Sequence, residues 1–307
     1  DILSKKTYYK KLKKFSKISL PSANNYKIEK VIKILIKSNK TIIIAGGGIK
    51  NNDGHKEVCN LAKILKVPII SSAGHGDVIS SDEKFYLGQM GPRGNKIATK
   101  KVYEAEVILA LGTRLGFNST FFSNEYINKK TKIIQIDIEK ISLGRYFPIE
   151  IGICADAKTV TKQITEKLIK KKHISKNNKW FENCINERKK YLIKRDKEAN
   201  LSQKPIHPSG IFKILRETLP RNSAITLDAG TLCLQATDML NYLKPRSLFT
   251  PLDFGLVGFS FACGLGVKLA KPNTHVISLM GDGGFGMTIS EISTAVKFKI
   301  NTITIIM

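Results

Sequence analysis

The chain has few acidic residues and no long uninterrupted apolar run. Its 25 Asp and Glu stand against 51 Lys and Arg, which gives a formal net charge of +26. No stretch approaches the roughly 20 apolar residues of a membrane-spanning helix, and the opening residues, DILSKK, contain no apolar signal region. We therefore predict a protein without a membrane partner.

Cysteine is also scarce, with five in 307 residues. The cysteines are Cys59, Cys154, Cys184, Cys233 and Cys263. No two of them form a CxxC pair or another zinc-like spacing, which argues against a zinc site. Scattered cysteines in mostly apolar contexts are typical of reduced thiols, so we predict a cytoplasmic location.

The excess of positive charge points first to nucleic acid or to an anionic membrane as a partner. The lysines, however, are spread over the whole chain, in Lys- and Asn-rich stretches such as 167–180. The sequence contains no basic stripe interleaved with aromatic residues and no nucleic-acid-binding motif. We predict that the protein has no nucleic-acid partner.

Alternation of apolar strands with helices predicts the fold. In the first half we expect strands at 41–48, 68–74, 105–114, 131–138 and 149–156, and helices at 55–67 and 157–172. In the second half we expect strands at 223–230, 247–251, 275–283 and 301–307, again separated by helices. Continuous apolar strands of this kind form parallel sheets that are covered on both faces. The predicted fold class is therefore α/β, with two doubly wound parallel-sheet domains.

A charged connector at 173–205 separates the two halves, and we interpret it as a surface helix and linker. The first domain, which is Rossmann-like, then covers 26–172, and the second covers 206–307. Ser209 is the expected N-cap of the helix that opens the second domain. The sheet of this second domain is predicted to be incomplete at the last residue of the sequence.

Glycine clusters follow four of the predicted strands, at 45–48, 111–116, 227–231 and 280–284. In parallel α/β sheets, ligands bind at the carboxyl ends of strands, where backbone amides face an anion. None of the clusters is a GxGxxG fingerprint or a GxxxxGK[ST] loop. A nicotinamide-type dehydrogenase and a P-loop enzyme are therefore disfavoured.

The last cluster differs from the others because it contains a charge, Asp282. A carboxylate is a hard oxygen ligand suited to Mg²⁺, which binds through one or two protein groups together with substrate phosphates. The glycines beside it would let the backbone approach such a ligand closely. Alternatively, Asp282 caps a helix at 287–299. The spacing alone leaves both interpretations open.

The stretch 281–307 resembles the thiamine-diphosphate signature, which is GDG followed, after a spacer, by Asn-Asn. On this pattern the asparagine pair is expected directly after Met307. The segments TIIIAGGGIK, ILALGTRLG, KIIQIDIE and GICADAK are similar, in order, to the central domain of the acetolactate synthase-like enzymes. AITLDAGT, TPLDFGLVGFSFACGLGVKLAKP and VISLMGDGGFGM are similar to their diphosphate-binding domain. The resemblance implies that 206–307 is a truncated diphosphate-binding domain and that 1–25 ends a pyrimidine-binding domain.

The resemblance also implies roles for individual residues. Asp282 would be a Mg²⁺ ligand, Val257 would prop thiamine diphosphate into its bent conformation, and the backbone near Gly255 would bind the aminopyrimidine. The implied cofactor-binding positions are Gly230, Thr231, Gly255, Val257, Gly258, Gly281, Gly283 and Gly284. The catalytic glutamate is expected in the pyrimidine-binding domain, so the fragment itself would contain no catalytic residue and would be inactive alone. The family's active site also forms between two subunits, which implies a homodimer or tetramer.

The implied activity is decarboxylation or carboligation of a 2-keto acid or related carbonyl compound, in the transferase or lyase class. Acetolactate synthases share an Arg-Phe-Asp-Asp run, and here Arg114 is kept whereas the aspartates are not. The resemblance allows FAD with Arg114 as a nucleotide contact, and the missing aspartates argue against it. The alternative activity is that of a sulfoacetaldehyde acetyltransferase. A non-catalytic, nucleotide-binding or regulatory homologue is the alternative of another class. His75 and Arg93 are interpreted as ordinary loop residues in preference to functional ones.

Overall fold

The structure, a computed structural model, describes residues 19–172 and 178–307. Its first sheet has six strands in the order β3-β2-β1-β4-β5-β6, and every pairing is parallel. The strands are β1 (Thr41–Ala45), β2 (Ile69–Ser71), β3 (Tyr86–Gln89), β4 (Val107–Leu111), β5 (Lys132–Asp137) and β6 (Ile151–Cys154). The strand order reverses between β1 and β4, so the carboxyl ends of these strands border a crevice.

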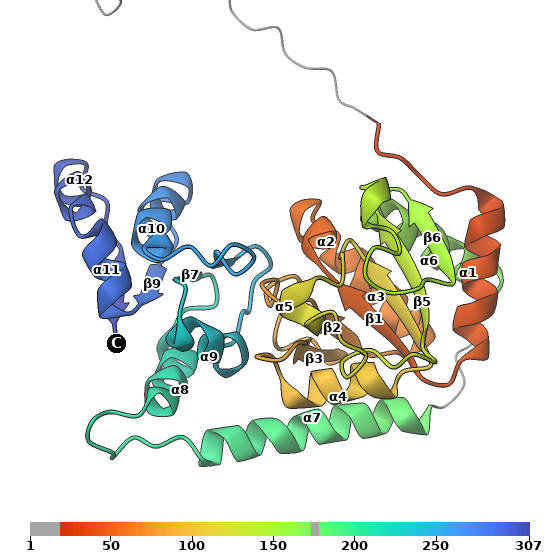
Figure 1. The fold of residues 1–307 in the computed structure, drawn as a ribbon, viewed down its shortest axis with the longest axis horizontal. Helices are drawn as coiled ribbons and strands as arrows, with labels where there is room; N and C mark the ends of the chain where they lie inside the picture. The colour runs from red at the N-terminus through yellow and green to blue at the C-terminus, as the bar shows by residue number, and fades with distance from the viewer. Residues whose placement is uncertain (1–18, 173–177) are drawn as a thin grey trace, which may run out of the picture.

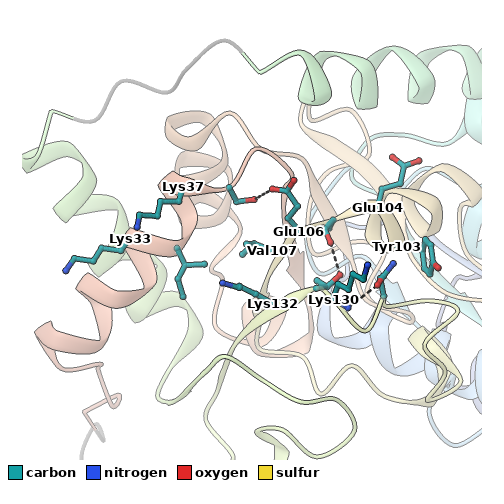
Figure 2. A pocket seen from close by; sticks show the side chains of 13 residues that line it. Lys33, Lys37, Tyr103, Glu104, Glu106, Val107, Lys130 and Lys132 are labelled. Atoms are coloured by element: carbon teal, nitrogen blue, oxygen red, sulfur yellow. Dashed lines mark hydrogen bonds between the residues drawn. The ribbon is translucent and has the colours of Figure 1, made fainter.

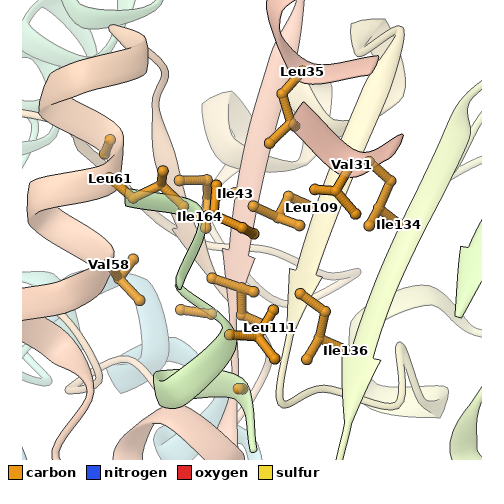
Figure 3. Packing of buried hydrophobic residues seen from close by; sticks show 14 of the residues in the cluster. Val31, Leu35, Ile43, Val58, Leu61, Leu109, Leu111, Ile134, Ile136 and Ile164 are labelled. Atoms are coloured by element: carbon orange, nitrogen blue, oxygen red, sulfur yellow. The ribbon is translucent and has the colours of Figure 1, made fainter. Parts of the chain in front are cut away.

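Helices cover both faces of this sheet (Figure 1). They are α1 (Asn25–Lys37), α2 (Gly47–Asn51), α3 (His55–Leu65), α4 (Lys96–Glu104), α5 (Phe117–Thr120), α6 (Ala157–Lys170) and the 3₁₀ helix η2 (Lys140–Ser142). Along β1, Ile43 belongs to one buried apolar cluster whereas Ile42 and Ile44 belong to another. Figure 3 shows the first cluster, in which α1, α3 and α6 pack on the sheet. The doubly wound prediction is confirmed for this half.

Helix α1 was not predicted, although its local signals are strong. The Asn24 side chain accepts a hydrogen bond from the backbone N–H of Lys27 at 2.9 Å, which satisfies one donor of the first turn. Four apolar side chains then follow at helical spacing and are buried, namely Ile28, Val31, Ile32 and Leu35. Of the segment assigned to a preceding domain, residues 1–18 lie outside the described part of the chain.

The connector contains helix α7 (Lys179–Lys197), as predicted, but one side of this helix is buried and not exposed at the surface. Phe181, Cys184 and Ile185 are buried in the second apolar cluster of the six-stranded sheet. The Lys101 ammonium of α4 lies 2.7 Å from the Glu187 carboxylate of α7 and is itself almost fully buried. In Figure 1 helix α7 runs below the six-stranded half, and its C-terminal end reaches the second half, where Arg195 donates to Asp238 O at 2.9 Å. The helix is therefore part of the fold.

The second sheet is also parallel, with four strands in the order β10-β9-β7-β8. Its strands are β7 (Ala224–Leu227), β8 (Leu248–Phe249), β9 (Val276–Met280) and β10 (Ile303–Ile306). Its helices are α8 (Pro208–Thr218), α9 (Thr231–Met239), α10 (Phe259–Ala270), α11 (Asp282–Thr288) and α12 (Glu291–Lys297). The α/β fold class with two parallel sheets is therefore confirmed.

Two local predictions for this half were wrong. The N-cap of α8 is His207, whose ring nitrogen accepts from the Ser209 N–H at 3.2 Å, because Pro208 already occupies the first helical position. The single helix predicted at 287–299 is two shorter helices, and the first of them begins at Asp282.

Much apolar surface of the second half is exposed. Val296 and Phe298 are 72% and 62% exposed, Met287 is 67% exposed, and α12 buries none of its residues. Within the described residues, no helix has the length and apolar character needed to cross a membrane.

Candidate functional site

Three loops meet at the carboxyl edge of the second sheet. Strands β7 and β9 are paired, with Leu227 opposite Leu279, so the residues that follow each strand are neighbours. The segments are the β7–α9 loop (228–230), the glycine turn (281–284) and the β8–α10 loop (250–258). The sequence predictions named residues in all three, and the structure brings these residues to one edge.

The buried carboxylate of Asp228 lies at the centre of this arrangement and was not among the predicted site residues. Its Oδ1 accepts hydrogen bonds from the backbone N–H of Ala229 at 2.6 Å and of Gly258 at 2.9 Å. Its Oδ2 lies 3.1 Å from the same Gly258 nitrogen. A charged residue directly after an apolar strand was the signal that could have identified it.

Gly258 and Gly284 are glycines because the loops approach one another closely. A Cβ on Gly284 would lie 2.8 Å from Asp228 Oδ2, which is closer than such atoms approach. Gly258 has φ of +85°, and a Cβ there would lie 3.2 Å from the Cβ of Met287. These two glycines are explained by packing within the chain.

Gly230, Gly255 and Gly283 lie in a different environment. A Cβ on any of the three would meet no atom of the described residues within 4 Å. Gly230 and Gly255 have positive φ angles of +118° and +71°, which account for glycine there, whereas Gly283 has no such constraint. The bare backbone of Gly283 therefore leaves room for a group outside the chain.

Among the described residues, the backbone donors at the helix starts of this edge have no partner. Gly230 is the N-cap of α9 and Gly281 that of α11, and neither end has a side-chain capping bond. The first N–H groups of a helix lack partners within it and favour an anion. Thr231 is exposed on the first turn of α9, and Val257 is 45% exposed at the end of the β8–α10 loop.

Asp282 is the first residue of α11 and is exposed. The N-cap of that helix is Gly281, so the alternative that Asp282 caps a helix at 287–299 is wrong. Within 19–172 and 178–307 its carboxylate has no hydrogen-bond or ion-pair partner, and no group of three or more His, Cys, Asp or Glu is placed to hold a metal. At this edge, Asp282 thus offers a carboxylate that is free to bind a cation.

A separate crevice of about 670 Å³ lies at the carboxyl ends of β1, β4 and β5. The glycines beside it pack against each other: a Cβ on Gly46 would lie 2.5 Å from Gly112 O, and one on Gly48 would lie 2.7 Å from Gly112 Cα. The 45–48 cluster is therefore a close loop contact. Burial raises the pKa of Asp137 and lowers that of His75, and both residues line this crevice.

Arg114 lines the crevice but is paired within the protein. Its guanidinium lies 3.3 Å from the carboxylate of Asp253, in the β8–α10 loop. Asn118 donates to Leu252 O in the same loop at 3.0 Å. Arg93 lies outside the crevice, over the ring of Phe121. The crevice and the three-loop edge therefore share one loop.

Residues that sequence reasoning missed fix strand β8, which precedes this loop, to the first half. The Lys50 ammonium lies 3.0 Å from the fully buried carboxylate of Asp77 and donates to Leu248 O at 2.6 Å. Asp77 Oδ2 in turn accepts from Leu248 N at 2.8 Å. Strand β8 is thus held by a charged pair of the other half.

Another hollow, of about 650 Å³, lies at the opposite, amino edge of the six-stranded sheet (Figure 2). The lysines that line it are Lys33, Lys37, Lys130 and Lys132. Its Glu106 accepts hydrogen bonds from Ser38 Oγ at 3.0 Å and Asn39 N at 3.2 Å. Because it borders the start of β4 and β5, it is remote from the glycine loops.

Comparisons with known proteins agree with this geometry. Residues 28–164 match the model of the thiamine pyrophosphate enzyme central domain, and residues 228–307 match that of the C-terminal TPP binding domain. The chain is 30% identical over 292 residues to a sulfoacetaldehyde acetyltransferase of Castellaniella defragrans, covering 89% of this chain and 49% of the relative.

Two further relatives have other names. A probable acetolactate synthase large subunit of Methanocaldococcus jannaschii is 32% identical over 279 residues, which is 89% of this chain and 46% of the relative. A glyoxylate carboligase of Escherichia coli O157:H7 is 25% identical over 284 residues, which is 91% of this chain and 47% of the relative. The chain spans about half the length of the curated relatives it matches.

Proposed function

Because the chain belongs to the thiamine pyrophosphate enzymes, we propose that it is part of a thiamine-diphosphate- and Mg²⁺-dependent enzyme acting on a 2-keto acid or related carbonyl compound. The observation that carries this proposal is the three-loop edge. It combines an exposed carboxylate with bare glycine backbone, and within residues 19–172 and 178–307 the first has no partner and the second no cover. Thiamine diphosphate, when bound, supplies an electron sink for loss of carbon dioxide or transfer of the resulting fragment.

The residues at the edge fit such a cofactor in charge and in shape. Asp282 would bind Mg²⁺ through one oxygen, as expected for a cation that is shared with phosphates. The uncapped amides that follow Gly230 and Gly281 would face the diphosphate, with Gly283 and Gly284 beside them. Gly255 and Val257, in the β8–α10 loop, would lie along the thiamine portion.

A titration tests these assignments. Binding of thiamine diphosphate to the full-length protein, measured by calorimetry with Mg²⁺, is expected to weaken about ten-fold or more in Asp282→Ala, because the cation loses its carboxylate. Removal of Mg²⁺ with a chelator should weaken binding in the wild type and change little in the variant. Glu125→Ala removes an exposed carboxylate of the first half that has no partner among the described residues, and it is the matched control. Equal affinity in Asp282→Ala and wild type would remove Asp282 from the metal site.

We propose an acetolactate synthase-like carboligase or decarboxylase as the activity, with sulfoacetaldehyde acetyltransferase as the alternative. The mixed names of the relatives support both. Since the chain covers about half of each relative, the catalytic glutamate is proposed to come from another part of the protein. Product analysis with pyruvate alone, and with sulfoacetaldehyde and phosphate, separates the two activities.

A nucleotide-binding role of the central crevice is the second candidate. Its volume and its position at the reversal of strand order support it. Arg114 would have to exchange Asp253 for the nucleotide's phosphate. Titration with FAD and with ADP distinguishes a flavoprotein from a protein that binds the adenine nucleotide alone. If neither compound binds, the crevice is not a nucleotide site.

A homo-oligomer is the proposed assembly. The exposed apolar residues of α11 and α12, among them Met287, Val296 and Phe298, support it, because apolar patches of this kind are typical of interfaces.

A further inference from the structure

The carboxylate of Asp228 is buried without a positive partner. It is 2% exposed, and across the described ranges no Lys, Arg or His lies within ion-pair distance of it. Its described hydrogen-bond donors are the backbone N–H groups of Ala229 and Gly258. A buried charge is costly unless hydrogen bonds compensate it, so this aspartate holds its loops by backbone contacts alone.

The two donors place Asp228 at the joint of two loops. Ala229 leads into Gly230 and the start of α9, whereas Gly258 ends the β8–α10 loop and is the N-cap of α10. Of the two, Gly258 is remote in sequence, and both carboxylate oxygens lie within 3.1 Å of its nitrogen. The bond therefore fixes the end of a loop whose preceding residues, 253–257, are exposed.

The third loop is held by shape. Gly284 packs so closely on Asp228 that an added Cβ would lie 2.8 Å from Oδ2 and 3.2 Å from Cγ. Gly284 O lies 3.5 Å from the Cβ position of Gly258. One carboxylate thus contacts the β7–α9 loop, the β8–α10 loop and the glycine turn, and it sets the spacing between them.

We infer that Asp228 is a positioning residue that holds Gly258 and Gly284 in register and thereby pre-forms the thiamine-diphosphate site. The inference rests on the function proposed above. The residue accepts a hydrogen bond from Gly258 N and packs against Gly284, which limits how closely the glycine turn can approach. It does not itself touch the cofactor. Pre-formed sites bind more tightly because loop ordering is completed before the ligand arrives.

Hydrogen exchange tests the joint without any ligand. In the cofactor-free, full-length protein, Asp228→Ala is expected to speed amide exchange of residues 252–258 about ten-fold or more, because the loop loses its anchor. Asp228→Asn keeps an acceptor oxygen for Gly258 N and should stay within about three-fold of wild type. Equal rates in wild type and Asp228→Ala would overturn the inference, and so would an Asn variant that exchanges like the Ala variant.

Binding provides the second readout. The dissociation constant of thiamine diphosphate with Mg²⁺ should rise about ten-fold or more in Asp228→Ala and recover in Asp228→Asn. Val276→Ala removes a buried side chain at the far, amino end of β9 and serves as the destabilised control. At matched melting temperature it should bind like wild type. If Val276→Ala weakens binding as much as Asp228→Ala, the effect is general destabilisation and the inference is wrong.

The steric half of the inference has its own variant. Gly284→Ala should weaken binding in the wild-type background, because its Cβ displaces the carboxylate, and should add little to Asp228→Ala, where that space is free. Fully additive effects would contradict the contact. Failure of the wild-type protein to bind thiamine diphosphate would instead remove the proposed function, while the exchange experiment would still decide the role of Asp228 in the loops.

Discussion

Gly283 and Gly284 are adjacent in one turn, but the chain constrains them differently. Gly284 faces Asp228 with no room for a Cβ, whereas Gly283 faces open space. We expect Gly284→Ala to lower the free energy of unfolding by about 1–3 kcal/mol, through overpacking. Gly283→Ala should leave it unchanged or raise it by about 0.5–1 kcal/mol, as expected for Gly→Ala in a helix. Urea denaturation of the two variants measures both values, and similar losses in both would contradict the packing assignment.

Histidine burial makes stability depend on pH. Burial, and then the Lys50 charge, hold the pKa of His75 below its ordinary 6.5. The unfolded chain therefore takes up a proton at higher pH than the folded one. The stability that comes from keeping His75 neutral is complete above about pH 7 and is lost as pH falls through ~6.5. The free energy of unfolding, measured from pH ~7.5 to ~5.5, should fall less in His75→Leu than in wild type. If the free energies of unfolding of the two proteins fall in parallel, His75 is not a source of the pH dependence.

At the level of elements, strand β8 has only two residues and depends on a buried ion pair of the other half. Lys50→Met leaves the carboxylate of Asp77 buried without its cation, and we expect a loss of about 3–5 kcal/mol in the free energy of unfolding. The double variant Lys50→Met/Asp77→Asn removes the charge but keeps an acceptor for Leu248 N, so it should recover part of that loss. Thermal unfolding of the single and double variants decides this, and a double variant no better than the single one would refute it.

Sequence patterns predicted nearly all strands of the described residues. Every strand except β3 lies inside its predicted range, including β8, which has only two residues. Strand β3 was missed, because only Tyr86 and Leu87 of its four residues are apolar. Helix α11 was placed too late, since its glycine-rich start has low intrinsic helix propensity.

Only those site residues could be predicted whose type is unusual in its local sequence. An aspartate among glycines drew attention to 281–284, and the structure confirms that these residues and the β7–α9 and β8–α10 loops share one edge. Their individual roles stay predictions. Asp228 and the pair Lys50 and Asp77 were missed, because their importance comes from contacts between segments 30 to 198 residues apart in the chain.

At the scale of the whole molecule, the second half exposes several large apolar side chains of α11 and α12. We expect Val296→Asp together with Phe298→Glu to shift the full-length protein toward monomer, because charges would enter the proposed interface. Sedimentation velocity measures the change. Ile169→Asp is the control, because Ile169 of α6 is 60% exposed and lies in the first half, and it should leave the assembly intact. An unchanged mass for the double variant would place the interface elsewhere.

The hold of the first half on β8 has a consequence for building hybrids of related enzymes. A crossover in the connector at 173–205 looks safe on the sequence, since it separates the two sheets. It would nevertheless pair the backbone of Leu248 with a foreign donor and a foreign acceptor, and Leu252 and Asp253 with foreign partners. A graft that keeps the cofactor half should therefore carry the partners of these residues with it, namely Lys50, Asp77, Arg114 and Asn118. The position of this loop depends on residues of both halves, which a simple exchange of halves would separate.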